Sequence, residues 1–394
     1  MAPKIHRRRF LGLLGAGALG LAIDPARLHG GTGGLGHPPQ LVFLQLTGGN
    51  DALNTVIPRK DPLYRALRKE LGVPAPTVLP LNEDLGFHPE LAPLMSPFEQ
   101  GHLAVLPAVG SPRPNLSHFR SLDNWHAGRA DLEHPKEGFV GKALREAKTT
   151  HIDLFHVGEG PTPLMFRGAP RPVVSLSSLD DLTLRTPPPR SPKGASPEGA
   201  GGELLRRLEA AQTQARAMNA RLERARKATN SALYPSFPLA KRLAVIASLI
   251  ATAEEPAVYF VELSGFDTHA SQDVAHPVLL RSFAHSLAGL LADLRAKRRF
   301  ESTCVAVYSD FGRRAQENAS RGTDHGKAGP MFLAGGRVAG GVIGRPYDLE
   351  NLDEGDLAMD IDYRSVQHHL MGEVLSLKNL KDPSERKLPR PILG

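Results

Sequence analysis

Runs of mostly apolar residues recur along the chain and predict buried β-strands. The longest runs cover residues 41–47, 103–109, 257–263 and 303–309, and shorter ones cover residues 152–157, 172–176 and 331–334. Segments with so few charges are typical of strands that are covered on both faces of a sheet. We therefore expect a large sheet with little of its surface in contact with water.

Helical patterns alternate with these strands in the second half of the chain. Residues 239–252 are apolar enough for a buried helix, and residues 277–299 have the pattern of a long amphipathic helix. Alternation of strands and helices favours a parallel sheet covered by helices. The sequence predicts an α/β fold with a central, mostly parallel sheet flanked by helices on both faces.

One segment interrupts this alternation and predicts an insertion. Residues 186–202 are rich in Pro, Gly and Ser, a composition typical of a linker that does not pack. Residues 203–227 consist largely of Ala, Leu, Arg, Glu and Gln and predict a helix with a narrow apolar stripe. We expect a single domain over residues 40–394, with residues 177–238 as a linker plus an inserted helical cap region.

The first residues have the form of an export signal. Arg7, Arg8 and Arg9 precede Phe10 and Leu11, and an apolar run follows to residue 23. A twin arginine followed by x-Phe-Leu predicts a twin-arginine signal, so residues 1–39 would be signal and linker. An ordinary secretory signal or an uncleaved anchor is the alternative. The apolar run is shorter than the roughly 20 residues that span a bilayer, so no stable membrane span is expected.

Charge and cysteine content narrow the classes of function. The formal net charge is +7, of which residues 1–26 contribute +3, and aromatic residues are 6% of the chain. This pattern does not favour a nucleic-acid partner. Cys304 is the only cysteine, which leaves no pair for an intrachain disulfide and no multi-cysteine metal site. It lies in an apolar run and is expected to be buried.

Polar clusters adjoin four of the predicted strands. Residues 47–51 (TGGND), 264–269 (SGFDTH) and 309–313 (SDFGR) each end a strand, and residues 322–326 (GTDHG) come before one. The carboxyl ends of parallel strands meet at one edge of an α/β sheet, where ligands bind. Side chains from the four clusters are therefore expected to lie together.

The residue types in these clusters predict a metal site. Asp51, Asp267 and Asp310 would repel one another unless a cation lay between them. Together with His269 and His325 they form a mixed oxygen and nitrogen set that suits Zn²⁺, Mn²⁺ or Fe. The alternative for each residue is a cap or turn, because Asp, Asn, Ser and Gly are common in loops.

Three further residues are candidates for catalysis. Ser117 is at a predicted helix N-terminus, where it could be a nucleophile or an ordinary N-cap. His118 could ligate a metal or act as acid and base. Arg313 could clamp a phosphate or sulfate through two hydrogen bonds, or form a surface ion pair.

The motifs resemble a known family. Gly-Gly-Asn-Asp, Asn-x-Ser-His-Phe, Gly-Phe-Asp-Thr-His, Ser-Asp-Phe-Gly-Arg and Gly-Thr-Asp-His-Gly occur in this order, and the resemblance covers roughly residues 41–375. Together they resemble bacterial domain of unknown function 1501, many members of which carry twin-arginine signals. That family is grouped with the alkaline phosphatase-like superfamily of phosphatases, sulfatases and related enzymes.

The resemblance implies roles for individual residues. Ser117 would match the superfamily's nucleophile, although loosely. The metal ligands would be Asp51 after the first strand, Asp267 with His269, Asp310, and His325. Phe311 departs from the pattern, because the superfamily has a metal-binding histidine there. One ion is then expected where two are usual, unless His118 or Asp324 replaces the missing ligand or catalysis has been lost.

These observations define the expected function. The leading expectation is a periplasmic or extracellular metal-dependent hydrolase of a phosphate or sulfate ester, on a small molecule or a polymer. It would hold one divalent ion such as Zn²⁺ or Mn²⁺, or two, and would meet the twin-arginine translocase during export. The alternative is a non-catalytic exported binding or assembly protein with a degenerate metal site on the same fold.

Overall fold

The central sheet is organised around β1 (Gln40–Thr47), which lies between two parallel neighbours. The computed structural model describes residues 36–131, 133–179, 213 and 216–394. Strand β8 (Ala257–Ser264) pairs with one edge of β1, and β9 (Thr303–Ser309) pairs with the other. The apolar runs that predicted these three strands therefore form the middle of the sheet.

Nine strands make up this sheet, in the order β13-β5-β12-β9-β1-β8-β6-β7, with β14 also paired to β5. Every pairing is parallel except those of β12 (Ala328–Gly335), which is antiparallel to both β5 (Leu103–Gly110) and β9. The expected central, mostly parallel sheet is therefore confirmed. The remaining strands are β6 (Asp153–Val157), β7 (Val173–Leu176), β13 (Gly341–Val342) and β14 (Ile361–Asp362).

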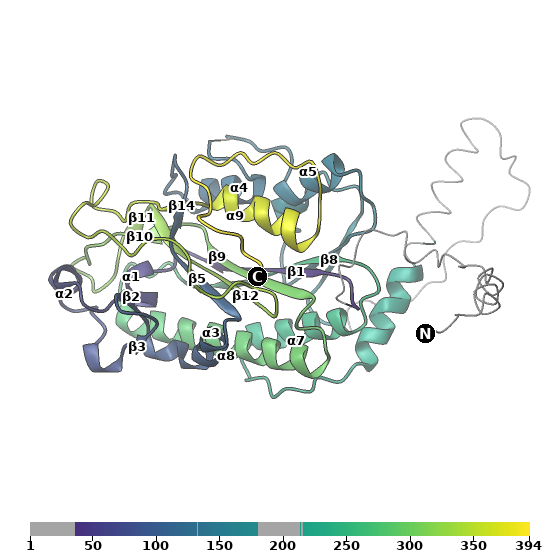
Figure 1. Ribbon diagram of the computed structural model, residues 1–394, viewed down its shortest axis with the longest axis horizontal. Helices are drawn as coiled ribbons and strands as arrows, with labels where there is room; N and C mark the ends of the chain where they lie inside the picture. The colour runs from purple at the N-terminus through teal and green to yellow at the C-terminus, as the bar shows by residue number, and fades with distance from the viewer. Residues whose placement is uncertain (1–35, 132, 180–212, 214–215) are drawn as a thin grey trace, which may run out of the picture. The chain divides into compact units, whose positions relative to one another are not determined.

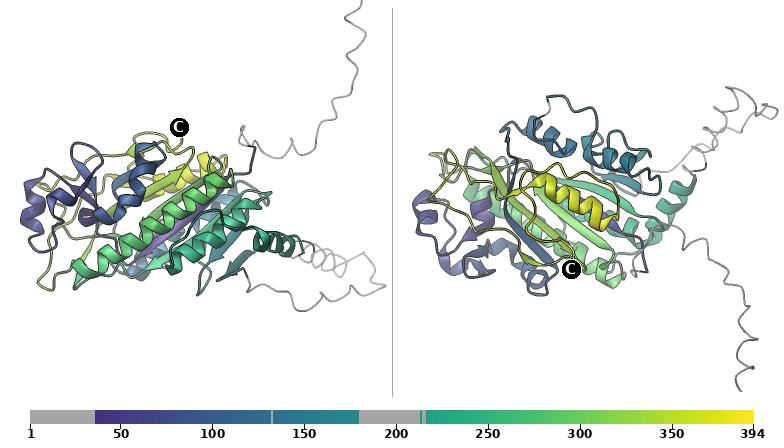
Figure 2. Two further views of the ribbon diagram at one scale, coloured as in Figure 1. Left: turned by 90° about the horizontal axis from the view of Figure 1, so that it is seen from below. Right: turned by 45° about the horizontal axis from the view of Figure 1, so that its top comes forward.

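Helices cover both faces of the sheet, as expected. Successive side chains of a strand point to opposite faces, so Leu41 and Val42 belong to different hydrophobic cores. Figures 1 and 2 show one group of helices on each side of the strands. The Val42 side is covered by α7 (Pro238–Ala251) and α8 (Gln272–Ala296), and the Leu41 side by α4 (His118–Ala127), α5 (Phe139–Glu146) and α9 (Tyr363–His369).

Helix α8 begins earlier than the pattern indicated. The sequence predicted a start at residue 277, but the helix begins at Gln272 and contains Pro277. Pro277 is the sixth residue of the helix and has no N–H, so it cannot donate the helical hydrogen bond to the carbonyl of Asp273. The extra turn contributes Gln272 and His276, which are both buried. They lie beneath the loop that follows β1 and contact it, as described below.

Smaller elements extend the end of the molecule that carries the polar clusters. Strands β2 (Val56–Pro58), β4 (Leu85–Phe87) and β3 (Leu79–Pro80) form an antiparallel sheet, and β10 (Gly312–Arg313) pairs with β11 (His325–Gly326). Three short helices are α1 (Ala52–Thr55), α2 (Pro62–Leu67) and α3 (Met95–Glu99). There are also 3₁₀ turns at Ala75–Thr77, Pro89–Leu94 and Leu164–Phe166, and a π-helical turn at Leu370–Val374.

Two sequence predictions fall wholly or partly outside the described residues. The twin-arginine motif is in residues 1–35, and much of the predicted insertion, including its linker, is in residues 180–212. Of the insertion's helix, residues 216–227 are described and are helical. No helix among the described residues is long and apolar enough to cross a membrane.

Candidate metal centre

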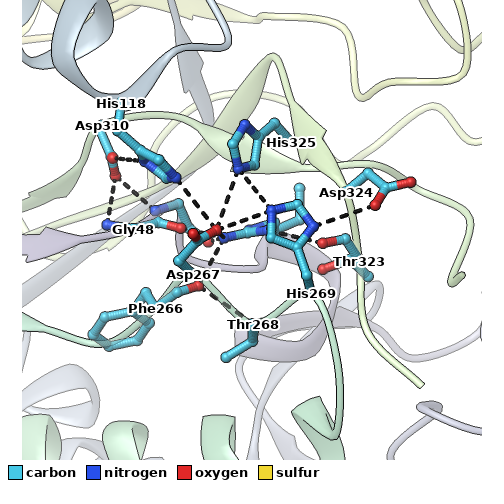
Figure 3. Close-up of polar contacts among 12 residues, drawn as sticks. Gly48, His118, Phe266, Asp267, Thr268, His269, Asp310, Thr323, Asp324 and His325 are labelled. Carbon is cyan, nitrogen blue, oxygen red and sulfur yellow. Dashed lines mark hydrogen bonds and ion pairs between the residues drawn. The ribbon is translucent and has the colours of Figure 1, made fainter. Parts of the chain in front are cut away.

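The four polar clusters meet at one edge of the sheet, as the topology requires. Strands β1 and β8 end in register, with Thr47 opposite Ser264, and Leu46 of β1 lies opposite Ser309 of β9. Gly110, the last residue of β5, pairs with the first residue of β12 at the same edge. The loops that follow β1, β5, β8 and β9 therefore converge with the loop before β12 (Figure 3).

Two glycines after β1 hold one of the predicted metal ligands. Gly48 and Gly49 have positive φ angles of 122° and 80°, and a Cβ atom on Gly48 would lie 2.4 Å from the backbone nitrogen of Asp267. Their amides donate to Oδ1 of Asp310 at 3.0 and 2.6 Å. Glycine is therefore required here both for the turn and for the close approach of two loops. Asp310 is buried, and these amides compensate its charge.

The second carboxylate oxygen of Asp310 orients His118. Oδ2 of Asp310 is 2.6 Å from Nδ1 of His118, and this hydrogen bond raises the pKa of His118 although burial opposes the shift. Because Nδ1 donates its proton to Asp310, Nε2 of the neutral ring carries a bare lone pair. Nε2 is buried, has no hydrogen-bond partner, and lies 3.3 Å from Oδ1 of Asp267.

Two other histidines are oriented in the same manner. Nδ1 of His325 is 2.6 Å from the carbonyl oxygen of Leu116, which can only accept, and Nδ1 of His269 is 3.3 Å from Oδ1 of Asp324. Their Nε2 atoms lie 3.2 and 3.1 Å from Oδ1 of Asp267 and 2.9 Å from each other. Figure 3 shows the imidazoles arranged around this carboxylate.

This arrangement fits a bound cation. Neutral imidazoles held through Nδ1 direct lone pairs at a carboxylate oxygen, which is repulsive unless a proton or a metal ion lies among them. The ligand atoms of His118, Asp267 and His325 all lie within 4.8 Å of one another, the one such group found among the described residues. Atoms bound tetrahedrally to one Zn²⁺ at 2.0–2.1 Å are about 3.3 Å apart. The three distances to Asp267 of 3.1–3.3 Å match that value.

Arg313 binds the loops of the site together. Its guanidinium is fully buried and donates to the carbonyl oxygens of Gly48, Gly49, Phe266 and Thr323. It also donates to Oδ1 of Asp267 at 2.7 Å. Burial raises the pKa of Asp267, but the hydrogen bond from Arg313 and the surrounding positive charge hold it well below its usual range.

The predicted role of Arg313 as an anion clamp is not supported by this geometry. A clamp needs free N–H groups, and those of Arg313 face backbone carbonyls and Asp267. Here it positions the loops, and a role in stabilising a transferred group stays a prediction.

Asp51 lies apart from the histidines and has a complete set of partners. It caps α1 through the amide of Leu53, and Arg68 approaches both carboxylate oxygens, at 2.5 and 3.0 Å. Gln272 donates to Oδ2 at 2.5 Å. Burial raises the pKa of Asp51, but the charge and hydrogen bonds of Arg68 bring it below its usual value. The cap alternative describes Asp51 better here than the predicted role of metal ligand.

The remaining candidates take different positions around the cluster. Asp310 and Asp324 contact imidazole Nδ1 atoms, so they orient possible ligands and are not themselves in the ligand group. Ser117 is the exposed N-cap of α4, and its hydroxyl does not cap the helix. Its place directly before His118 is compatible with a nucleophile, which stays a prediction.

Phe311 packs against the histidines at the position where a ligand was expected. Its ring centroid is 4.7 Å from that of His118 and 4.6 Å from that of His325. The side chain is buried and packs beside both rings, which are themselves in contact at 4.4 Å between centroids. His118 is in the group of candidate ligands and Phe311 is outside it. That His118 replaces the missing histidine stays a prediction.

Several residues of the site were not found from the sequence. Arg68, Gln272 and Ser121 have no motif that marks them, and Ser121 donates to the carbonyl oxygen of Asp310. Leu116 contributes only its carbonyl oxygen, which no side-chain pattern can indicate. The sequence indicates only a turn at Gly48 and Gly49, whereas their amides hold Asp310.

Several solved structures are similar to this one in fold. A protein in the alkaline phosphatase superfamily from Vibrio parahaemolyticus is 12% identical, with a TM-score of 0.41 over 86% of this chain and 67% of that chain. The lipoteichoic acid synthase LtaP from Listeria monocytogenes is 9% identical, with a TM-score of 0.43 over 88% and 74%. The C-terminal periplasmic domain of EcEptC from Escherichia coli, in complex with Zn, is 10% identical, with a TM-score of 0.38 over 77% and 74%.

These similarities concern the fold and carry no argument about activity. No curated protein matches the sequence. The model of a family described as "Protein of unknown function (DUF1501)" matches residues 38–349, which is most of the chain. This match confirms the family that the motifs indicated. The chain belongs to the DUF1501 family.

Proposed function

We propose that this protein is an exported metal-dependent hydrolase of a phosphate or sulfate ester. The observation that carries the proposal is the convergence of three Nδ1-anchored imidazoles on one oxygen of Asp267. His118, Asp267 and His325 would hold the ion, with His269 beside them. Nitrogen and oxygen ligands of this kind suit Zn²⁺ or Mn²⁺. When bound, the ion would polarise the ester oxygen and activate a hydroxyl or a water.

The protein's own groups would prepare the reaction in two ways. The Asp310 carboxylate fixes the proton of His118 on Nδ1, so Nε2 stays available to a ligand. Ser117 presents its hydroxyl at the N-terminus of α4, where unpaired amides and the helix dipole favour a developing negative charge. Ser117 would be the nucleophile, or would orient a water in that role.

Metal analysis combined with an ester assay tests this proposal. We expect about one divalent ion per purified chain, and hydrolysis of 4-nitrophenyl phosphate, bis(4-nitrophenyl) phosphate or 4-nitrophenyl sulfate. Asp267→Ala and His118→Ala should lose the ion and reduce kcat/KM by about 10²-fold or more. His134→Ala changes an exposed histidine outside the cluster and is the matched control. A chain that binds no ion after loading with Zn²⁺ or Mn²⁺ and cleaves none of the esters would refute it.

The second candidate is a non-catalytic binding or assembly protein that keeps one ion for stability. Phe311 favours it, because an apolar ring occupies the position of an expected ligand. In that case the ion would raise Tm in the wild-type chain without any ester being cleaved.

Export by the twin-arginine route is the part of the proposal that rests on sequence alone. The motif at Arg7 and Arg8 supports it, and export of an already folded chain would suit a site loaded with its ion beforehand. Replacing both with Lys should retain the precursor in the cytoplasm, as fractionation and immunoblotting would show. Unchanged export of this double variant would argue for a different signal.

A further inference from the structure

A polar cavity of about 240 Å³ lies beside the first turn of α4. Arg113, Asn115, Arg120, Asp131 and Glu133 contribute to its wall. Asn115 also accepts a hydrogen bond from the backbone of Ser117, so the wall continues directly into the loop that carries the candidate nucleophile. The cavity therefore adjoins the metal centre through a single short loop.

The first turn of α4 links the cavity to the histidine cluster. Successive residues of an α-helix are rotated by about 100°. His118 faces Asp310 and the cluster, whereas Arg120, two residues later, lines the cavity. Phe119 lies between these two directions and is 85% exposed. Phe119 is not among the residues that line the cavity, but a ligand that passed from the cluster to the cavity on the Phe119 side of the helix would cover its aromatic ring.

The cavity combines donors and acceptors without a net charge. The formal charges of Arg113 and Arg120 cancel those of Asp131 and Glu133, so the wall does not select for a second anion. Arg113 forms exposed ion pairs with Asp131 at 3.5 Å and Glu385 at 3.1 Å, which are weak and exchangeable. Within the described part of the chain, the Arg120 side chain forms no hydrogen bond or ion pair. Hydroxyl groups, which both donate and accept, suit such a wall.

The size of the cavity and the exposed ring restrict the ligand further. Its volume is below the roughly 300–1,000 Å³ of pockets that hold drug-sized molecules, so it suits a single ring. One face of a sugar ring presents C–H groups, and covering Phe119 with such a face would remove apolar area from water.

From these observations we infer that the cavity and Phe119 form a subsite for a sugar ring, and that the substrate is a phosphate or sulfate ester of a saccharide. The inference rests on the proposed function for the ester, whereas the sugar subsite stands on the cavity itself. Arg120 and Asn115 would bind ring hydroxyls, and Phe119 would support the ring while the ester group reached the metal centre.

Direct binding separates the subsite from catalysis. The full chain would be titrated by NMR or calorimetry with methyl glucoside, methyl galactoside and N-acetylglucosamine, and with their 6-phosphates and 6-sulfates. We expect at least one of these sugar units to bind, and Arg120→Ala and Phe119→Ala each to weaken that binding about tenfold. Arg129→Ala, an exposed arginine that does not line the cavity, is the matched control and should bind normally.

Kinetics then connects the subsite to the ester reaction. We expect the ratio of kcat/KM for the sugar ester to that for the 4-nitrophenyl ester to fall about tenfold in Arg120→Ala. If no ester is cleaved but a sugar binds through Arg120, the proposed function fails and the subsite stands. If esters are cleaved and none of the sugars or sugar esters binds, or if binding and the ratio are unchanged in both variants, the subsite is refuted.

Discussion

Two carboxylates at the same edge of the sheet have opposite surroundings. Asp51 follows β1 and receives hydrogen bonds from Arg68, Gln272 and a backbone amide. Asp267 follows β8 and, apart from the donor Arg313, faces the Nε2 atoms of three histidines. Arg68 and two further donors satisfy the Asp51 carboxylate, whereas Asp267 has Arg313 as its one charged donor and shares the same oxygen with three Nε2 atoms that would hold an ion. An aspartate after a strand is therefore not sufficient to predict a ligand, because its neighbours decide its role.

The largest expected effect concerns the stability of the Asp51 region. Asp51→Ala would leave the Arg68 guanidinium buried without its carboxylate. Breaking a buried ion pair in this way costs about 3–5 kcal/mol in the free energy of unfolding. Urea denaturation of metal-free protein would measure the loss. Asp61→Ala removes the cap of α2 and is the comparison, with an expected loss of about 1 kcal/mol. Equal losses in the two variants would contradict the assignment.

Measuring stability at several pH values should distinguish the surroundings of Asp51 from those of Asp267, because the free energy of unfolding should change with pH in opposite directions. Burial lowers the pKa of His276, which contacts Asn50 next to Asp51, to about 3. As pH falls, His276 therefore binds a proton in the unfolded chain before it does so in the folded chain. The free energy of unfolding decreases below about pH 6.5, by about 3 kcal/mol at pH 4.

His118 should behave in the opposite sense, because its pKa is raised in the folded protein. In metal-free protein, the contribution of His118 to the free energy of unfolding is complete below about pH 6.5. This contribution is lost as pH rises through the pKa of His118 in the folded chain. Urea denaturation of wild type, His276→Asn and His118→Asn at several pH values would measure both effects. Parallel curves for the three proteins would show that neither histidine is coupled to folding in this way.

A smaller effect is expected from the carboxylate that orients His118. In Asp310→Asn the amide oxygen can still accept from Gly48 and Gly49, but the amide nitrogen would face Nδ1–H of His118. The ring would then carry its proton on Nε2, where it blocks a ligand. Losses of partners of this kind typically weaken metal binding by about 10–100-fold. Competition with a zinc chelator would measure it, and unchanged affinity would show that Asp310 does not control the tautomer.

The smallest effect is expected at the exposed counterpart of Asp310. Asp324 is 59% exposed in its side chain and is 3.3 Å from Nδ1 of His269, so water can replace it. Asp324→Asn should weaken zinc binding less than tenfold, which is below the loss in Asp310→Asn. The same chelator competition would rank the two variants, and the reverse order would mean that His269 is the more important ligand.

Local patterns were sufficient for part of this structure. The uncharged runs of β1 and β9 predict strands. The rule that the carboxyl ends of parallel strands meet at one edge predicts that Asp267 and His325 lie close together, as they do. The partners of Asp51 could not be predicted, because the contact from Arg68 depends on the path of a short helix and that from Gln272 on an early start of α8. Asp310 was recognised as important, but its role depends on two backbone amides and an imidazole from distant segments.

The buried Arg313 has a consequence for how the chain folds. Its guanidinium reaches the loops after β1 and β8 and the segment before β11 at the same time. Contacts between segments so distant in sequence form late, because the intervening chain must be ordered first. The site is then completed only when the strands around β1 are in register. Capture of a metal ion would therefore be a late folding event, and would report that the chain has reached its native topology.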